Sequence, residues 1–233
     1  MTAGRILYRG PSALNGEPIV CVSTGEDGRS SNRKTGPMVQ TWILHGTLDP
    51  VAASRAAEDS AVCGSCPHRW ALGGACYVNI GQAPGSVYRA AMAGAYPADD
   101  GSPFGFPVRV GSYGDPAAVP VQVWRSVLAR APRARTGYTH QWRRGPALKG
   151  VCMASVDTPR EREQAKAAGW RTFRTRAAGA PLLAGEIDCP ADAGLTDCAS
   201  CGLCNGAAGA GDRRRDISIQ LHGARAPRRV AAG

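Results

Sequence analysis

Short apolar runs alternate with polar segments along the middle of the chain, and this pattern predicts an α/β protein. The expected strands there are residues 108–113, 135–140, 150–156 and 171–175. Between them, residues 115–130 and 157–169 carry helix-start signals, in which an aspartate or threonine is followed closely by proline. Strands that alternate with helices form parallel sheets with crossover helices, so we expect parallel strands.

The flanking segments add fewer elements to this pattern. Further strands are expected at residues 19–22, 38–44 and 216–222, and further helices at 49–60 and 86–95, with the rest of residues 1–37 rich in loops. A complete eight-fold barrel requires about 200–250 residues and more helices than these. The expected fold class is therefore α/β, a partial or reduced TIM-like barrel of parallel strands with a Cys-rich C-terminal metal segment. Its expected domains are a barrel-like domain at 1–185, the metal-binding segment at 186–223 and a basic flexible tail at 224–233.

Composition narrows the class of protein. The 233 residues are 43% hydrophobic and 20% charged, which excludes a fully disordered chain. No apolar run has the length of a membrane span or a secretory signal, so we expect a cytoplasmic protein with no membrane partner. The net charge of +10 favours an anionic partner, a nucleotide or nucleic acid, although the scarcity of lysine beside arginine is also what a GC-rich genome produces.

The sequence contains nine cysteines, and most of its candidate metal ligands are among them. Cys21 and Cys152 stand alone inside apolar runs and are expected to be buried as small hydrophobic residues. Cys63, Cys66 and Cys76 form a C-x2-C-x9-C group with His68 among them. Three thiolates with this histidine would complete a tetrahedral zinc site, whereas three thiolates alone would hold an iron–sulfur cluster with one open iron.

The second group of thiols is more specific. Cys189, Cys198, Cys201 and Cys204 fall among turn-forming residues, and the last three have the C-x2-C-x2-C spacing of bacterial ferredoxin ligands. Cys189 would supply the fourth thiolate of a cluster. Zinc is the alternative, held by four thiolates or by three with His222. We favour an iron–sulfur cluster here because equally spaced cysteines suit one cluster face.

Polar motifs follow three consecutive expected strands, GSYGDP at 111–116, GYTHQW at 137–142 and ASVD at 154–157. Chemistry in α/β folds lies beyond the carboxyl ends of strands, so these side chains are expected to converge. The candidate catalytic residues are Asp115, His140 and Asp157, as general acids or bases. For each aspartate, the favoured alternative is that it caps a helix. The candidate substrate-binding residues are Tyr113, Tyr138, Gln141, Trp142, Ser155 and Arg174.

Four segments of the chain resemble segments of an uncharacterised family of bacteriophage and plasmid proteins. They are SNRKTGPMVQTWIL at 31–44, CxxCxHR…CY at 63–77, GSYGDP and GYTHQW. A phage origin would place the protein in the cytoplasm of the bacterial host. The chain is more distantly similar to radical S-adenosylmethionine (SAM) enzymes, which pair a partial barrel with a three-cysteine cluster, usually spaced C-x3-C-x2-C. It is also similar to tRNA-guanine transglycosylases, barrels with a C-terminal zinc site of three cysteines and one histidine.

Two classes of function follow from these features. The first is a radical-SAM-like enzyme that depends on a metal cluster, for which we favour iron–sulfur over zinc. SAM is its candidate cofactor, and a nucleotide or nucleic acid is its expected substrate. A zinc-containing, transglycosylase-like base-modifying enzyme is its catalytic alternative. The second class is a non-catalytic, zinc-stabilised nucleic-acid-binding protein. Convergence of the polar motifs on one pocket would favour an enzyme, which is the class we prefer, and dispersal would favour the binding protein.

Overall fold

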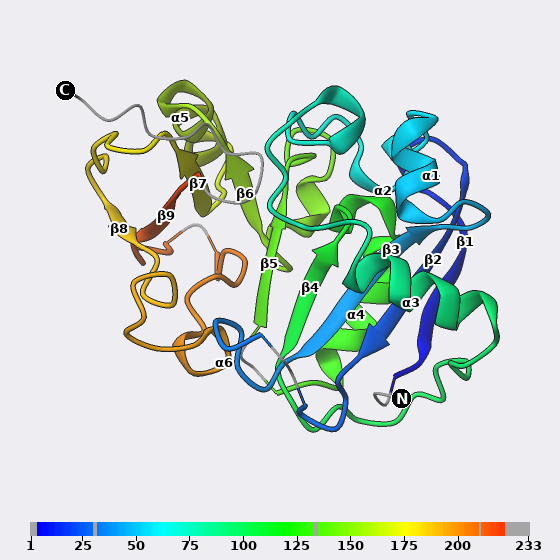
Figure 1. Cartoon of the computed structure of the whole chain (residues 1–233). Coiled ribbons are helices and arrows are strands. Elements are labelled where there is room, and N and C mark those ends of the chain that lie inside the picture. The colour runs from blue at the N-terminus through cyan, green and yellow to red at the C-terminus, as the bar shows by residue number, and fades with distance from the viewer. Residues whose placement is uncertain (1–3, 30–31, 133–134, 210, 222–233) are drawn as a thin grey trace.

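One nine-stranded sheet organises the chain, in the order β1-β2-β3-β4-β5-β6-β7-β9-β8 (Figure 1). The computed structural model describes residues 4–29, 32–132, 135–209 and 211–221. The strands are β1 (Ile6–Pro11), β2 (Pro18–Thr24), β3 (Val39–His45), β4 (Val108–Tyr113), β5 (Arg135–Thr139), β6 (Met153–Val156), β7 (Thr172–Arg176), β8 (Glu186–Asp188) and β9 (Asp216–Gln220). All neighbours from β3 to β8 run parallel, whereas β2 is antiparallel to both β1 and β3.

The expectation of an α/β fold with parallel strands is confirmed, but the sheet is not closed. Strands β1 and β8 form its two edges, so no strand pair completes a ring. The N-terminal hairpin explains one edge. Because β1 and β2 precede the first parallel strand and run antiparallel, they extend the sheet beyond β3. Sequence analysis expected only one strand in this region.

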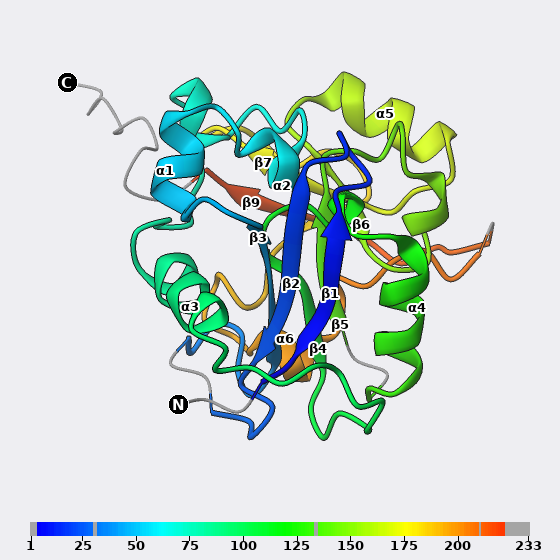
Figure 2. The ribbon, with the colours of Figure 1, turned by 90° about the vertical axis from the view of Figure 1, so that its right-hand side faces the viewer.

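Helices cover both faces of the sheet. They are α1 (Pro50–Arg55), α2 (Ser60–Cys63), α3 (Ala83–Met92), α4 (Val121–Ala129), α5 (Pro159–Ala167) and α6 (Cys198–Cys201), with single 3-10 turns at Trp70–Leu72, Pro116–Ala118 and Pro146–Leu148. Figure 2 shows α1 and α3 on one side of the sheet and α4 and α5 on the other. Among the described residues, no helix has the length and apolar character that crossing a bilayer requires.

Capping residues and prolines set the helix boundaries. Asp49 caps α1 as expected, but the helix ends at Arg55, two residues before Ala57, which has a φ of +60°. Asp115 caps only the 3-10 turn at Pro116–Ala118, and α4 starts after Pro120, whose ring lacks the N–H that a continuous helix would use. The cap of α5 is Thr158, whose hydroxyl oxygen accepts the N–H of Glu161.

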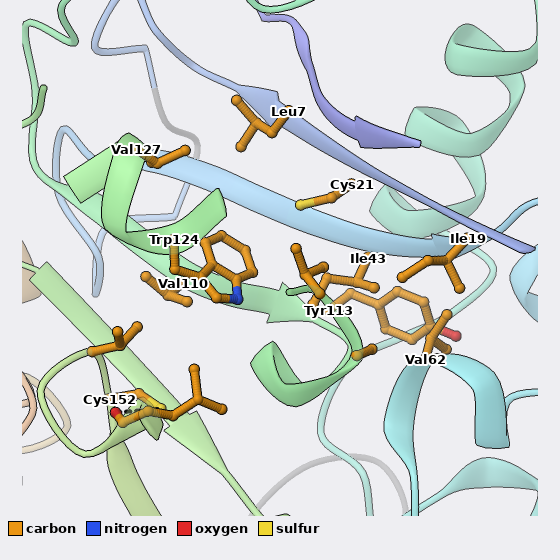
Figure 3. Close-up of a cluster of buried hydrophobic side chains, with 14 of the residues drawn as sticks. Leu7, Ile19, Cys21, Ile43, Val62, Val110, Tyr113, Trp124, Val127 and Cys152 are labelled. Carbon is orange, nitrogen blue, oxygen red and sulfur yellow. Dashed lines mark hydrogen bonds between the residues drawn. The ribbon is translucent and has the colours of Figure 1, made fainter. Parts of the chain in front are cut away.

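The main core includes buried residues of α3 on one side of the sheet and of α4 on the other (Figure 2). Trp124 of α4 is fully buried near Val110 of β4, and its indole N–H donates to the Pro116 carbonyl at 2.8 Å (Figure 3). Figure 3 also shows Cys21 and Cys152 among these apolar side chains, and both thiols are fully buried. The expectation that they act as small hydrophobic residues is confirmed.

The cysteine-rich segment is continuous with this sheet. Its two strands, β8 and β9, pair with each other, and β9 pairs with β7. A small apolar cluster of Met153, Cys204 and Ile217 fastens the segment to β6. Residues 224–233, the expected tail, and His222, the candidate zinc ligand, lie outside the described residues.

Candidate active site and metal centres

The N-terminal thiol cluster (Cys63, Cys66 and Cys76) lies in the connection between β3, the first parallel strand, and β4. Cys63 ends α2, and the other two thiols lie in the loop after it. The Cys66 N–H donates to the Cys63 carbonyl, and the Cys76 N–H donates to the His68 carbonyl, so the loop folds back on itself. Gly74 permits this fold: a Cβ there would lie 2.5 Å from the His68 backbone. Burial, with the neighbouring Cys66 and Cys76, raises the pKa of Cys63. The Cys63 thiol is therefore neutral unless a metal displaces its proton.

The C-terminal thiol cluster (Cys189, Cys198, Cys201 and Cys204) is held near the opposite ends of the strands. The Cys198 N–H donates to the Lys34 carbonyl before β3, and the Cys204 carbonyl accepts the N–H of Gly137 in β5. Burial raises the pKa of Cys198 to about 11 and that of Cys204 to about 12, and neighbouring thiols add to both shifts. Figure 1 shows α6 near the lower ends of β4 and β5 and the α2 loop near their upper ends.

A pocket of about 320 Å³ joins the two thiol clusters. Its wall includes all three N-terminal thiols together with Cys189 and Cys198. Between them, the pocket is lined by alternate residues of the strands, and this places it on the face of the sheet opposite α4. Arg109 and Tyr138 line this floor, and the Tyr138 ring lies 4.1 Å from that of Phe173, measured between centroids.

Arg109 is a half-buried cation in the floor of this pocket. Its Nη2 donates to the Tyr77 hydroxyl at 2.5 Å. Burial lowers the pKa of the guanidinium, but Tyr77, Tyr138, Cys198 and Cys204 outweigh that effect and hold it above its usual value. Arg109 therefore stays charged beside the C-terminal thiols and gives the pocket a positive centre.

A histidine–aspartate group (His68, His140 and Asp157) lies beside the N-terminal thiols. His68 Nε2 is 2.8 Å from Asp157 Oδ1, and His140 Nε2 is 3.3 Å from Asp157 Oδ2. Burial lowers the pKa of His140, but Asp157 and Cys66 outweigh it and raise that pKa to about 10. Burial opposes ionisation of Asp157 as well, yet the two imidazoles bring its pKa below the usual value.

No relative with which to compare this site was found among known proteins. No protein-family model, no curated protein and no solved structure matches the chain. The resemblances drawn from the motifs thus stay predictions.

Several expected site residues do meet at the pocket. Tyr113, Asp115, Tyr138, His140 and Ser155 all line it. Asp157 is not part of the wall but contacts His140 behind it. The convergence expected for the three strand-end motifs is therefore observed for most of their polar side chains.

Asp115 is engaged in a structural role at this pocket. Its Oδ1 accepts the N–H of Ala117 and the hydroxyl of Thr139, and its Oδ2 accepts the N–H of His140. Burial raises its pKa, although these hydrogen bonds oppose the shift. Asp115 thus joins the ends of β4 and β5, and its role as a general base stays a prediction.

Three of the expected substrate-binding residues point elsewhere. Gln141 supports the thiol loop, since its Oε1 accepts the Ser65 hydroxyl at 3.0 Å. Trp142 is buried in the main core, and the guanidinium of Arg143 lies 3.9 Å from its ring centroid. Arg174 faces the opposite side of β7 from Phe173 and forms a buried ion pair with Glu186 at 2.7 Å. None of the three lines the pocket, so their role in substrate binding stays a prediction.

Arg109 and Tyr77 were missed as pocket residues by sequence analysis. The available signal was the strand Val108–Tyr113, in which Arg109 is the one charged residue among apolar neighbours. A charge within a buried strand indicates a polar site on that face of the sheet.

Proposed function

We propose that this protein is an iron–sulfur enzyme of radical-SAM-like type that acts on a nucleotide or nucleic-acid substrate in the pocket between its two thiol clusters. The observation that carries the proposal is that thiols of both clusters line the wall of the same pocket as the polar strand-end residues. A protein that only binds nucleic acid through structural zinc has no need to collect thiols, hydroxyls and an imidazole around one cavity.

The spread of the thiols favours a cluster over a single zinc ion. In a tetrahedral zinc site with Zn–S distances of about 2.3 Å, the sulfur atoms lie only about 3.8 Å apart. Among the described residues, no three cysteine sulfurs lie within 4.8 Å of one another. A multi-iron cluster does not require so close an approach, because each thiolate binds a different iron. Cys63, Cys66 and Cys76 would leave one iron open, and the four C-terminal thiols would saturate a second cluster.

The order of the strands supports the radical-SAM-like part of the proposal. The N-terminal thiols follow the first parallel strand, and Gly114 and Asp115 follow the second, at the same edge of an open parallel sheet. The sheet itself is open and mostly parallel. When bound, the open-site cluster with SAM would supply one-electron chemistry. The residues of this chain then exclude water, hold the substrate against Tyr138 and Phe173, and match its negative charge with Arg109.

The test is metal and sulfide analysis, with a visible spectrum, of protein purified without oxygen. We expect a brown protein with acid-labile sulfide and about eight irons per chain, the content of two four-iron clusters. Combined substitution of Cys63, Cys66 and Cys76 by alanine should remove about half of the iron and abolish SAM binding. The matched control combines Cys21→Ala and Cys152→Ala, which removes two buried thiols and should change neither. A colourless protein that contains only zinc would overturn the proposal.

A further inference from the structure

The histidine–aspartate group brings together three segments that are far apart in the sequence. His68 comes from the loop after β3, His140 from the end of β5 and Asp157 from the end of β6. One nitrogen of each ring and one carboxylate oxygen lie within 4.8 Å of one another. Among the described residues, no other three histidine, cysteine or acidic ligand atoms meet so closely.

We propose that His68, His140 and Asp157 bind a single divalent transition-metal ion of the Zn²⁺ or Fe²⁺ class, separate from the thiol clusters. Two imidazoles and one carboxylate form a ligand set typical of such ions, and three protein ligands leave coordination positions open for water or substrate. This site does not depend on the iron–sulfur proposal, because none of its ligands is a thiol.

The distances are compatible with a shared ion as well as with hydrogen bonds. Ligand atoms about 2.0–2.1 Å from a tetrahedral zinc ion lie about 3.3 Å apart. The two Nε2–carboxylate contacts are 2.8 and 3.3 Å. His140 Nε2 is buried and, within the described part of the chain, makes no hydrogen bond of good geometry, although it faces Asp157. An ion between these atoms would satisfy that nitrogen.

Outer contacts hold two of the ligands in place. The N–H of His140 donates to Asp115 Oδ2 at 2.8 Å, and the N–H of Asp157 donates to Glu161 Oε2 at 3.0 Å. Such contacts orient the ligands of a metal site before the ion arrives. The contact with the His140 N–H also gives Asp115 a positioning role at the pocket.

Cys66 is the competing ligand, because its thiol also contacts His140. The two arrangements differ in the spectrum of bound cobalt. A Co²⁺ ion held by nitrogen and oxygen shows weak visible bands, whereas a thiolate ligand adds an intense near-ultraviolet charge-transfer band. The proposal requires the first spectrum.

The experiment is a titration of the anaerobically purified full chain with Co²⁺ alone. The amount of bound Co²⁺ and its absorption spectrum in Asp157→Asn are subtracted from those of the wild type. We expect about one Co²⁺ per chain in the difference, without a thiolate band, and competition by Zn²⁺. His68→Gln and Asp157→Asn should each weaken binding by at least about 100-fold, since loss of an outer partner alone costs 10- to 100-fold.

The matched control is His45→Asn, which removes the other described imidazole and keeps an acceptor for the N–H groups of Thr47 and Leu48. It should bind Co²⁺ as the wild type does. Unchanged binding in both His68→Gln and Asp157→Asn, or a thiolate band in the difference spectrum, would overturn the proposal. Asp157→Asn retains size and shape, and far-ultraviolet circular dichroism of each variant separates metal loss from unfolding. Brown colour and sulfide report on the thiol clusters independently.

Discussion

Substitution of Glu186 tests the account of Arg174 as a structural residue. The Glu186 carboxylate accepts Arg174 Nε at 2.7 Å, Arg174 Nη2 at 2.7 Å and the Leu183 N–H at 2.8 Å. Arg162 Nε lies 3.3 Å from the same carboxylate. Glu186 is 4% exposed and Arg174 is 3% exposed. The change Glu186→Gln keeps the volume but leaves the buried guanidinium without its counter-charge.

The expected loss is about 3–5 kcal/mol of the free energy of unfolding, the usual result of removing one partner of a buried ion pair. For a domain whose total is about 5–15 kcal/mol, this is a large fraction. The double variant Arg174→Met with Glu186→Leu replaces both charges with apolar groups. It should recover most of the loss, because a buried pair is often no more stable than a packed apolar replacement.

The assay is urea denaturation of each variant between pH 7 and pH 3. Burial raises the pKa of Glu186, but Arg174 and the Leu183 N–H outweigh it and lower that pKa below its value of about 4.3 in the unfolded chain. Stability from this carboxylate is therefore complete above the unfolded pKa and is lost as pH falls through the folded pKa. The gap between wild type and Glu186→Gln should narrow in acid. A loss under about 1 kcal/mol at pH 7, or a gap independent of pH, would refute the ion-pair account.

Two further substitutions test how the pocket is built. Asp115→Asn replaces one of the two carboxylate oxygens that together accept from Ala117, Thr139 and His140 with an amide donor. This change should cost about 1–3 kcal/mol, a fall in Tm of roughly 2–10 °C by calorimetry, and a Tm equal to wild type would contradict the capping role. Gly74→Ala places a Cβ 2.5 Å from the backbone of the thiol loop, so it should lower the iron content of anaerobic protein, while Gly105→Ala, with open space around it, should not; equal iron in both would contradict the close-approach argument.

The parallel part of the fold was predictable because its signals are local. Strand β4 matches its expected boundaries of 108–113, and Thr158 with Pro159 begins α5 as expected. The missed strands lack such signals: β8 has only three residues, and β1 is an edge strand whose run ILYRGP has no clear alternation. Edge strands depend on pairing with a neighbour, and pairing is a long-range property.

The residue types of the site were predictable, but their partners were not. His68 was assigned with the thiols next to it in sequence, yet its carboxylate partner is Asp157, 89 residues away. For Arg174, the face of the strand on which its side chain lies could not be predicted. Its charge was visible, but one step along β7 separates the pocket face, where Phe173 lies, from the face of the buried ion pair. Such a one-residue distinction depends on which face of the strand the fold covers.

The positive charge of Arg109 bears on the redox chemistry that we propose for the pocket. The pKa of Cys198 rises through burial, and Arg109 opposes that rise, so the guanidinium stabilises negative charge on the C-terminal thiols. The reduced form of an iron–sulfur cluster carries one more negative charge than the oxidised form, and nearby positive charge raises its reduction potential. Arg109→Gln should therefore make the potential of the C-terminal cluster more negative in an electron paramagnetic resonance titration. Arg143→Gln, which removes a half-exposed charge outside the pocket, is the control and should leave it unchanged. An unchanged potential in Arg109→Gln would mean that this cation does not act on the C-terminal cluster.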